Sequence, residues 1–172
     1  MTEDDATNKM GKYFIWIAWI IALAILVFIF QAALEKQWNP NTNPNYALND
    51  TGKAEVYLQR NKQGHYIAQG TLNEHEVTFL LDTGATTVSI PEHIAAQLGL
   101  QKFGRYPVQT ANGTVYVYQT KVEQLSIGNL SFNNVDAHIN PGMKSDVILL
   151  GMSVLKRVEF NQTGNQLILR EQ

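Results

Sequence analysis

One acidic residue stands where an acid can do chemistry. Asp82 follows the apolar run Phe79-Leu80-Leu81 and precedes the turn Thr83-Gly84-Ala85. A carboxylate beside buried apolar residues costs free energy unless hydrogen bonds compensate it. Thr83 can donate a hydroxyl hydrogen bond, and Gly84 allows the backbone to approach closely. The stretch therefore holds a carboxylic acid at a defined position beside buried apolar residues, as general acid–base chemistry on a water molecule requires.

Other reactive side chains form weaker patterns. His75-Glu76 begins like a zinc-protease helix, but Phe79 stands where the second histidine would be, and the stretch favours a strand. We expect His65, His93 and His138 to be surface or turn residues. The serines lack a nucleophile-elbow context. The absence of cysteine rules out a disulfide scaffold, a thiolate nucleophile and a zinc site built on sulfur. The expected site therefore uses no metal and no organic cofactor.

The charge balance narrows the range of partners. The 172 residues include 13 Lys+Arg against 15 Asp+Glu, which gives a formal net charge of −2. Proteins that bind nucleic acid carry a basic patch that neutralises phosphates, and this sequence shows none. A nucleic-acid partner is therefore not expected.

The loop at Asp82 resembles a known catalytic motif. Asp-Thr-Gly-Ala after apolar residues is similar to the catalytic loop of the aspartic proteases, and the chain length points to their single-domain, retropepsin-like branch, which has membrane-anchored bacterial members. That family also carries two apolar residues and a glycine before a short helix, and Leu149-Leu150-Gly151 followed by residues 152–155 is similar. The resemblance covers roughly residues 55–169. It implies an all-β, closed-barrel domain with one or two short helices.

The resemblance also implies roles for particular residues. Asp82 would be the catalytic carboxylate, and its loop would be shaped by Thr83, Gly84, Ala85 and Thr86. The second motif would support that loop from behind through Leu149, Leu150 and Gly151. A hairpin flap at residues 109–114 would cover an extended peptide substrate through Thr110, Ala111, Asn112 and Gly113.

A single Asp-Thr-Gly motif predicts the quaternary structure. Aspartic-protease chemistry needs two carboxylates that share one proton. After residue 36 the chain has three other aspartates, Asp50, Asp136 and Asp146, and none has the same context. The enzyme is therefore expected to be a homodimer in which each subunit supplies Asp82. If the chain follows the viral members, its terminal strand at residues 166–170 ends near the dimer seam.

Two other functions remain open, as does a purely structural role for Asp82. Asp82 could be the first residue of an ordinary Asx turn between two strands. The domain could then be a non-catalytic peptide-binding module, or a structural envelope protein that only assembles on a membrane. A carboxylate pair on the dimer axis has no use in a pure scaffold, so the intact motif favours the enzyme.

Short alternating strands dominate the pattern after residue 50. Strands are expected at 54–58, 66–72, 77–81 and 88–90, with turns at 73–74, 112–113, 128–129 and 163–165. The Asn-Gly step at 112–113 is typical of a hairpin tip. Helices are expected at 91–98, where Gly99 is the stop, and at 152–155.

An apolar segment precedes this domain. From Phe14 to Phe30, 17 consecutive residues are uncharged and almost all apolar. We predict a short tail at 1–12, a transmembrane helix at 13–34 that spans the lipid bilayer, an Asn- and Pro-rich linker at 35–50 and the protease domain at 51–172. A cleaved signal peptide is the alternative for the apolar segment, although its acidic flank is unusual for one.

The flanking charges predict an orientation. Lys9 and Lys12 lie before the apolar segment, and Lys36 is the close cation after it. The positive-inside rule then places the N-terminus in the cytoplasm and the catalytic domain outside it, as on the periplasmic side of a bacterial inner membrane.

Overall fold

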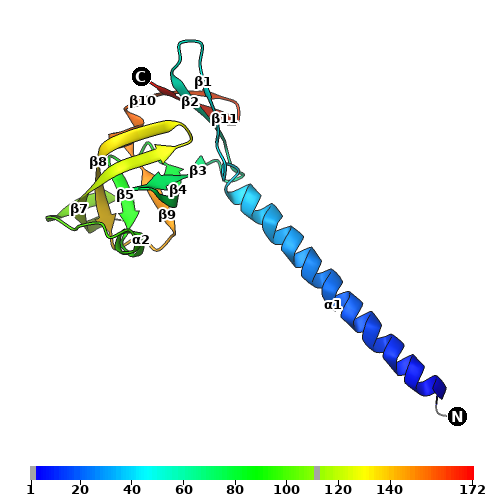
Figure 1. Ribbon diagram of the computed structural model, residues 1–172. Helices are drawn as coiled ribbons and strands as arrows, with labels where there is room; N and C mark the ends of the chain where they lie inside the picture. Colours follow the sequence, from blue (N-terminus) through cyan, green and yellow to red (C-terminus); the bar gives the residue numbers. More distant parts are fainter. Residues whose placement is uncertain (1–2, 111–112) are drawn as a thin grey trace. The chain divides into compact units, whose positions relative to one another are not determined.

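The computed structural model describes residues 3–110 and 113–172, with side chains from residue 13 onward. The chain divides into two compact units, which meet between Gln37 and Trp38. The first is essentially one helix, α1 (Glu3–Trp38), drawn in blue in Figure 1. Its apolar part, Tyr13–Trp38, has 26 residues, none of them buried within the chain. At 1.5 Å per residue this part is about 39 Å long, which exceeds the roughly 30 Å of a hydrocarbon core.

The second unit is mostly β, as predicted. Its larger sheet has the strand order β3-β4-β9-β5-β8-β7-β6, and β3 also pairs with β7, so the sheet curls back on itself. These strands are β3 (Ile67–Leu72), β4 (His75–Leu81), β5 (Val88–Pro91), β6 (Arg105–Thr110), β7 (Gly113–Ile127), β8 (Leu130–Asn140) and β9 (Val147–Leu150). Apolar side chains fill the curl, and Phe79, Leu72 and Ile90 are fully buried.

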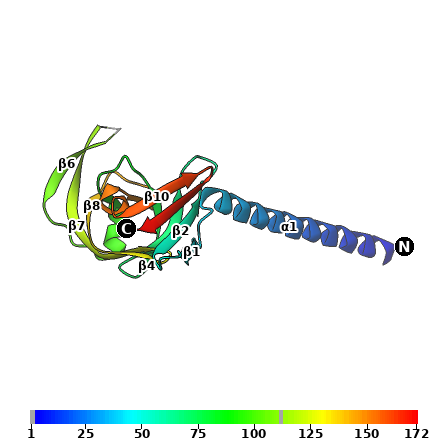
Figure 2. The same cartoon turned by 90° about the horizontal axis from the view of Figure 1, so that it is seen from above.

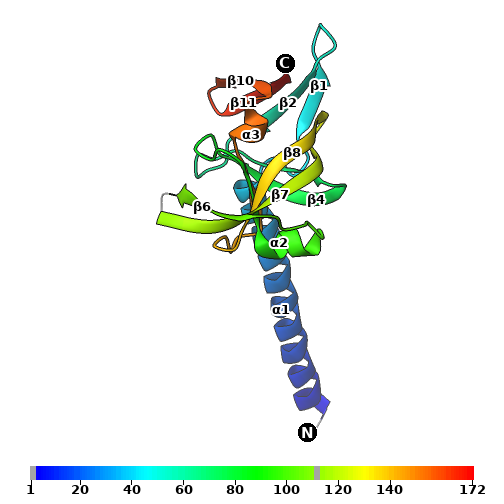
Figure 3. The ribbon, with the colours of Figure 1, turned by 90° about the vertical axis from the view of Figure 1, so that its left-hand side faces the viewer.

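A second sheet has four strands in the order β1-β2-β11-β10. It comprises β1 (Asn45–Leu48), β2 (Ala54–Gln59), β10 (Val158–Thr163) and β11 (Gln166–Glu171). Figure 3 shows these strands gathered above the larger sheet, with the short helix α3 (Met152–Leu155) beneath β10. The other short helix, α2 (Glu92–Gln97), follows β5. Both helices lie at the predicted positions.

Three of the four expected turns lie wholly within the described residues, and all three occur. Asn73 and Glu74 join β3 to β4 with positive φ angles of 48° and 69°. Gly128-Asn129 joins β7 to β8, and the residues around Gly164 join β10 to β11. Strands β6 and β7 form the predicted flap hairpin, with Thr110 opposite Gly113, and this hairpin projects from the domain in Figure 2. Ala111 and Asn112, two of the predicted flap residues, lie outside the described residues.

The structure differs from the expected linker at residues 35–50. Helix α1 continues to Trp38, and β1 pairs with β2 from Asn45 to Leu48. Between them, Asn41 is buried: its Nδ2 donates to the carbonyls of Gln59 and Ile67, and its Oδ1 accepts the N–H of Gln59. An asparagine side chain can satisfy backbone groups in place of a neighbouring strand. This polar segment therefore belongs to the β domain.

Candidate active site

Asp82 lies immediately after the last residue of β4. Strand β4 runs parallel to β9, with Leu80 opposite Leu149 and Leu81 opposite Leu150. The N–H of Asp82 donates to the carbonyl of Leu150 at 3.1 Å. The two motifs identified in the sequence are therefore neighbours in the sheet, although 69 residues separate Asp82 from Gly151.

The turn after Asp82 is closed by the carboxylate itself. Asp82 Oδ1 accepts the N–H of Gly84 at 2.9 Å, and the Asp82 carbonyl accepts the N–H of Ala85 at 3.2 Å. A Cβ added to Gly84 would lie 3.1 Å from Oδ1, so a glycine suits this close approach. The geometry matches the Asx turn weighed above. Among the described residues, the second carboxylate oxygen has no hydrogen-bond partner and is free to act.

The loop is held from behind by the start of α3. The N–H groups of Met152 and Ser153 donate to the carbonyls of Ala85 and Thr86 at 2.8 and 2.9 Å. Gly151 makes this contact possible, because an added Cβ would lie 2.5 Å from the Thr87 carbonyl oxygen and 2.7 Å from that of Ala85. The predicted support residues thus lie against the predicted loop.

A cleft of about 420 Å³ opens on one side of Asp82. It lies between the Asp82 loop and the flap strand β6, and its far wall comes from β5, β8 and β9. We call it the cleft; its lining residues are Asp82, Gly84, Ala85, Thr86, Ser89, Val108, Gln109, Thr110, His138, Asn140 and Leu149. Of the predicted flap residues, Thr110 lines it.

The polar wall of the cleft was not predicted. His138 was expected at the surface, but its exposed fraction is only 8%, and that of Asn140 is the same. Burial lowers the pKa of the His138 imidazole, which favours its neutral form. Its Nδ1 has no hydrogen-bond partner among the described residues. The sequence signal was weak: a histidine and an asparagine two residues apart at the end of an apolar strand.

A smaller pocket of about 230 Å³ lies on another side of the loop. We call it the seam pocket; its lining residues are Tyr66, Leu81, Asp82, Thr83, Leu155, Phe160, Gln162, Leu167 and Leu169. It connects the Asp82 loop with β10 and β11. The hydroxyl of Tyr66 is buried there without a hydrogen-bond partner in the described part of the chain.

The remaining candidates lie elsewhere. His75 and Glu76 begin strand β4 and are exposed, so they form no zinc-protease helix. His93 Nε2 lies 2.8 Å from Asp146 Oδ1 at the surface, and Asp136 is exposed on β8. Within residues 3–110 and 113–172, no group of three or more His, Asp or Glu side chains is arranged to hold a metal ion.

Comparison with known proteins agrees with this geometry. The profile of the "gag-polyprotein putative aspartyl protease" family matches residues 68–157, more than half of the chain. The crystal structure of a retropepsin-like aspartic protease from Rickettsia conorii is similar, with a TM-score of 0.57 and 25% sequence identity; the match covers 74% of this chain and 95% of that one. The predicted retropepsin-like fold is confirmed.

Two bacterial sequences are also similar. An uncharacterised protein encoded 5′ of cobV in a Sinorhizobium species is 29% identical over 157 residues, which cover 86% of this chain and 67% of the relative. An uncharacterised protein of Rickettsia prowazekii is 28% identical over 130 residues, or 73% of this chain and 54% of the relative. The chain thus spans about two thirds of the first relative and about half of the second.

Proposed function

Because this chain belongs to the gag-polyprotein aspartyl protease family, we propose that it is an aspartic endopeptidase with Asp82 as its catalytic carboxylate. One observation carries the proposal. The Asp82 carboxylate is held by the N–H of Gly84 in its own turn, and the Asp82 backbone N–H is held by β9, yet the side chain lines a cleft beside the flap strand β6. That is the placement a peptide substrate and a reacting water require.

The proposed mechanism uses two carboxylates. Two acids about 3 Å apart cannot both be ionised, so they share one proton. The ionised carboxylate takes a proton from water as the water oxygen bonds to the scissile carbonyl carbon, and the protonated carboxylic acid donates to the carbonyl oxygen. The carboxyl group that took the proton from water then donates it to the scissile nitrogen, and the other carboxylate takes a hydroxyl proton back from the tetrahedral diol. The C–N bond breaks to give an amine and a carboxylic acid, and the pair again shares one proton. Each chain supplies one Asp82, so the active species is a homodimer.

The substrate is an extended peptide. In the cleft it would lie between the loop and β6, where Val108 and Leu149 offer apolar contacts and Gln109 a polar one. A flap strand recognises such a peptide chiefly through backbone hydrogen bonds. The apolar part of α1 would anchor the enzyme in a bilayer with its N-terminus in the cytoplasm, which raises the local concentration of subunits.

Peptide-library cleavage by the full chain in detergent micelles tests the function. We expect cleavage between about pH 4 and 7, and a loss of about 10²–10⁴-fold in rate for Asp82→Asn, because a neutral amide cannot accept the proton from water. Asp136→Asn is the matched control, since Asp136 is exposed and lines neither pocket.

Two results would overturn the proposal. A folded, dimeric wild type that cleaves no peptide would point to the peptide-binding module instead. Equal cleavage by the wild type and Asp82→Asn would remove Asp82 from the chemistry. Whether the apolar segment is an anchor or a cleaved signal peptide is a separate question. The mass of the mature chain answers it, because cleavage of a signal peptide would remove α1.

A further inference from the structure

The C-terminal strand has no edge to offer to a second subunit. β11 pairs with β2 on one side and with β10 on the other, all within one chain. If the chain follows the viral members, this strand ends near the dimer seam, but both of its edges are already paired and it cannot itself add to a partner's strand. In the described part of the chain, the outer strands of this sheet are β1 and β10. A partner that extends the sheet must add to one of these two strands.

β10 lies beside Asp82. Phe160 is opposite Leu169 and Gln162 is opposite Leu167, so these four side chains share one face of the sheet. All four line the seam pocket together with Asp82. Leu167 and Leu169 are buried, but Phe160 is 50% exposed. An exposed aromatic ring next to buried leucines gains free energy when a partner covers it.

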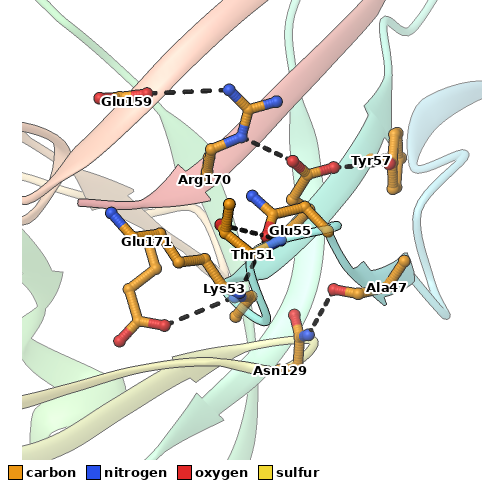
Figure 4. Close-up of polar contacts among 11 residues, drawn as sticks. Ala47, Thr51, Lys53, Glu55, Tyr57, Asn129, Glu159, Arg170 and Glu171 are labelled. Atoms are coloured by element: carbon orange, nitrogen blue, oxygen red, sulfur yellow. Dashed lines mark hydrogen bonds and ion pairs between the residues drawn. The ribbon is translucent and has the colours of Figure 1, made fainter.

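The edge of β10 carries no device that would prevent strand addition. Edge strands are commonly protected by lysine, proline or a bulge, and Val158–Thr163 pairs in continuous register and contains neither lysine nor proline. Its one charge, Glu159, lies 3.8 Å from Arg170 of the neighbouring strand (Figure 4). Because Glu159 alternates with Phe160, it points to the other face of the sheet and leaves the seam pocket uncharged at β10.

The edge of β1 is partly covered by the chain itself. Asn129 Nδ2 donates to the carbonyl of Ala47 at 2.9 Å, as Figure 4 shows. The side chain of Tyr46 lies against Gly128, where an added Cβ would be 3.3 Å from its ring. No residue of β1 lines either pocket that contains Asp82. Of the two edges, β10 is therefore the one that connects to the site.

We propose that two copies of the chain join edge to edge through β10, antiparallel about a two-fold axis, to form a continuous eight-stranded sheet. A strand that pairs antiparallel with its own copy is self-complementary, as a two-fold axis requires. In this dimer the two seam pockets would lie next to each other across the two-fold axis, and the two Asp82 loops would face each other there. This inference rests on the proposed function, since a second Asp82 completes the dyad.

Cross-linking of the full chain in micelles locates the seam. The chain has no cysteine, so single cysteines introduce no competing disulfides. Directly opposed residues of antiparallel strands have Cα atoms about 4.5–5.5 Å apart, within the range of a disulfide. On mild oxidation we expect a covalent dimer from at least one β10 variant and none from the β1 controls. The β10 set is Phe160→Cys, Asn161→Cys and Gln162→Cys; the control set is Tyr46→Cys, Ala47→Cys and Leu48→Cys.

The second test introduces a charged side chain at the proposed seam. Phe160→Lys should weaken dimerisation at least about tenfold in sedimentation equilibrium, and the peptidase rate should fall with the dimer population. Leu48→Lys is the matched control, because Leu48 is an exposed apolar residue at the other edge of the same sheet. Its dimerisation should equal that of the wild type.

The outcomes separate the two proposals. A dimeric, active wild type that cross-links through β1, or that tolerates Phe160→Lys, overturns the β10 seam and leaves the protease intact. A wild type that stays monomeric and inactive at every concentration overturns the proposed function, and this inference with it.

Discussion

The two pockets that share Asp82 differ in chemistry. The cleft has polar groups on its far wall, from Ser89, His138 and Asn140, and a flap strand above it. The lining of the seam pocket includes four leucines and Phe160, beside the polar side chains of Tyr66, Asp82, Thr83 and Gln162. A peptide chain offers hydrogen-bonding groups, whereas a stable contact between subunits favours apolar surface. Under the two proposals above, the cleft with its polar side chains would receive substrate, and the leucine-lined seam pocket would receive a second copy.

Each pocket also contains one buried polar atom without a partner in the described residues. In the cleft it is His138 Nδ1, and in the seam pocket it is the Tyr66 hydroxyl. Buried polar groups are nearly always hydrogen-bonded, so an exception needs an explanation. These two atoms lie where a further molecule is proposed to bind, substrate in one case and a subunit in the other. A third such atom, Asn129 Oδ1, lies outside both pockets at the turn between β7 and β8, so an unpartnered atom does not by itself mark a binding face.

The largest structural effect should come from the glycine that packs behind the Asp82 loop, the loop that both pockets share. Gly151→Ala places a Cβ 2.5 Å from the Thr87 carbonyl oxygen, although the φ of −88° at Gly151 is open to any residue. Overpacking of this kind costs about 1–3 kcal/mol and would push the Asp82 loop out of place. We expect a lower melting temperature and a loss of cleavage together.

Gly104→Ala is the control for this change, because a Cβ at Gly104 has no atom within 4 Å. Gly104→Ala should leave the melting temperature and the cleavage rate near their wild-type values. If Gly151→Ala melts and cleaves like the wild type, the contact between α3 and the loop does not position Asp82.

The difference between the pockets also shows what the sequence could reveal. Local turn signals predicted the hairpins, and the Asp82 loop and the Leu149–Gly151 motif are short local motifs through which the resemblance to the aspartic proteases was recognised. The polar wall depends on the parallel pairing of β5 with β8, which sets Ser89 opposite His138. These residues are 49 positions apart, and no local period connects them. The sequence did not reveal the ordered part of residues 35–50 for a related reason, since the backbone partners of Asn41 are Gln59 and Ile67, which lie on strands further along the chain.

A smaller effect should separate the cleft from the seam pocket. His138→Phe removes the imidazole from the cleft, and we expect the preference for a polar substrate side chain there to fall by about 0.5–1.5 kcal/mol, the usual contribution of one hydrogen bond. The melting temperature should hold or rise, because an unpartnered buried nitrogen is removed. Cleavage profiling and thermal unfolding measure the two quantities.

Tyr66→Phe is the matched variant in the seam pocket. It also removes a buried polar atom without a partner, so the melting temperature should again hold or rise. The substrate preference should stay as in the wild type, because Tyr66 does not line the cleft. Equal changes of preference in both variants would contradict the division into a substrate face and a subunit face.

The smallest effect should come from a charge network outside both pockets. Glu55 is buried on β2, where its Oε2 accepts the hydroxyl of Tyr57 at 2.7 Å and its Oε1 accepts Arg170 Nε at 2.6 Å (Figure 4). The Tyr57 hydrogen bond, followed by Arg170, lowers the pKa of the Glu55 carboxyl. A carboxyl with a lowered pKa in the folded state adds stability above its unfolded pKa, and this stability is lost as the pH falls through the folded value.

Glu55→Gln should therefore lower the melting temperature at neutral pH, and its difference from the wild type should shrink as the solution is acidified. Glu159→Gln, which removes an exposed acid 3.8 Å from the same Arg170, should have a smaller effect at any pH.

Neither variant should alter substrate preference, because neither glutamate lines the cleft. A pH-independent loss in Glu55→Gln would mean that Glu55 acts by packing and not by its charge. A changed cleavage profile would mean that the second sheet and the cleft are coupled, and that the two faces of Asp82 are not independent.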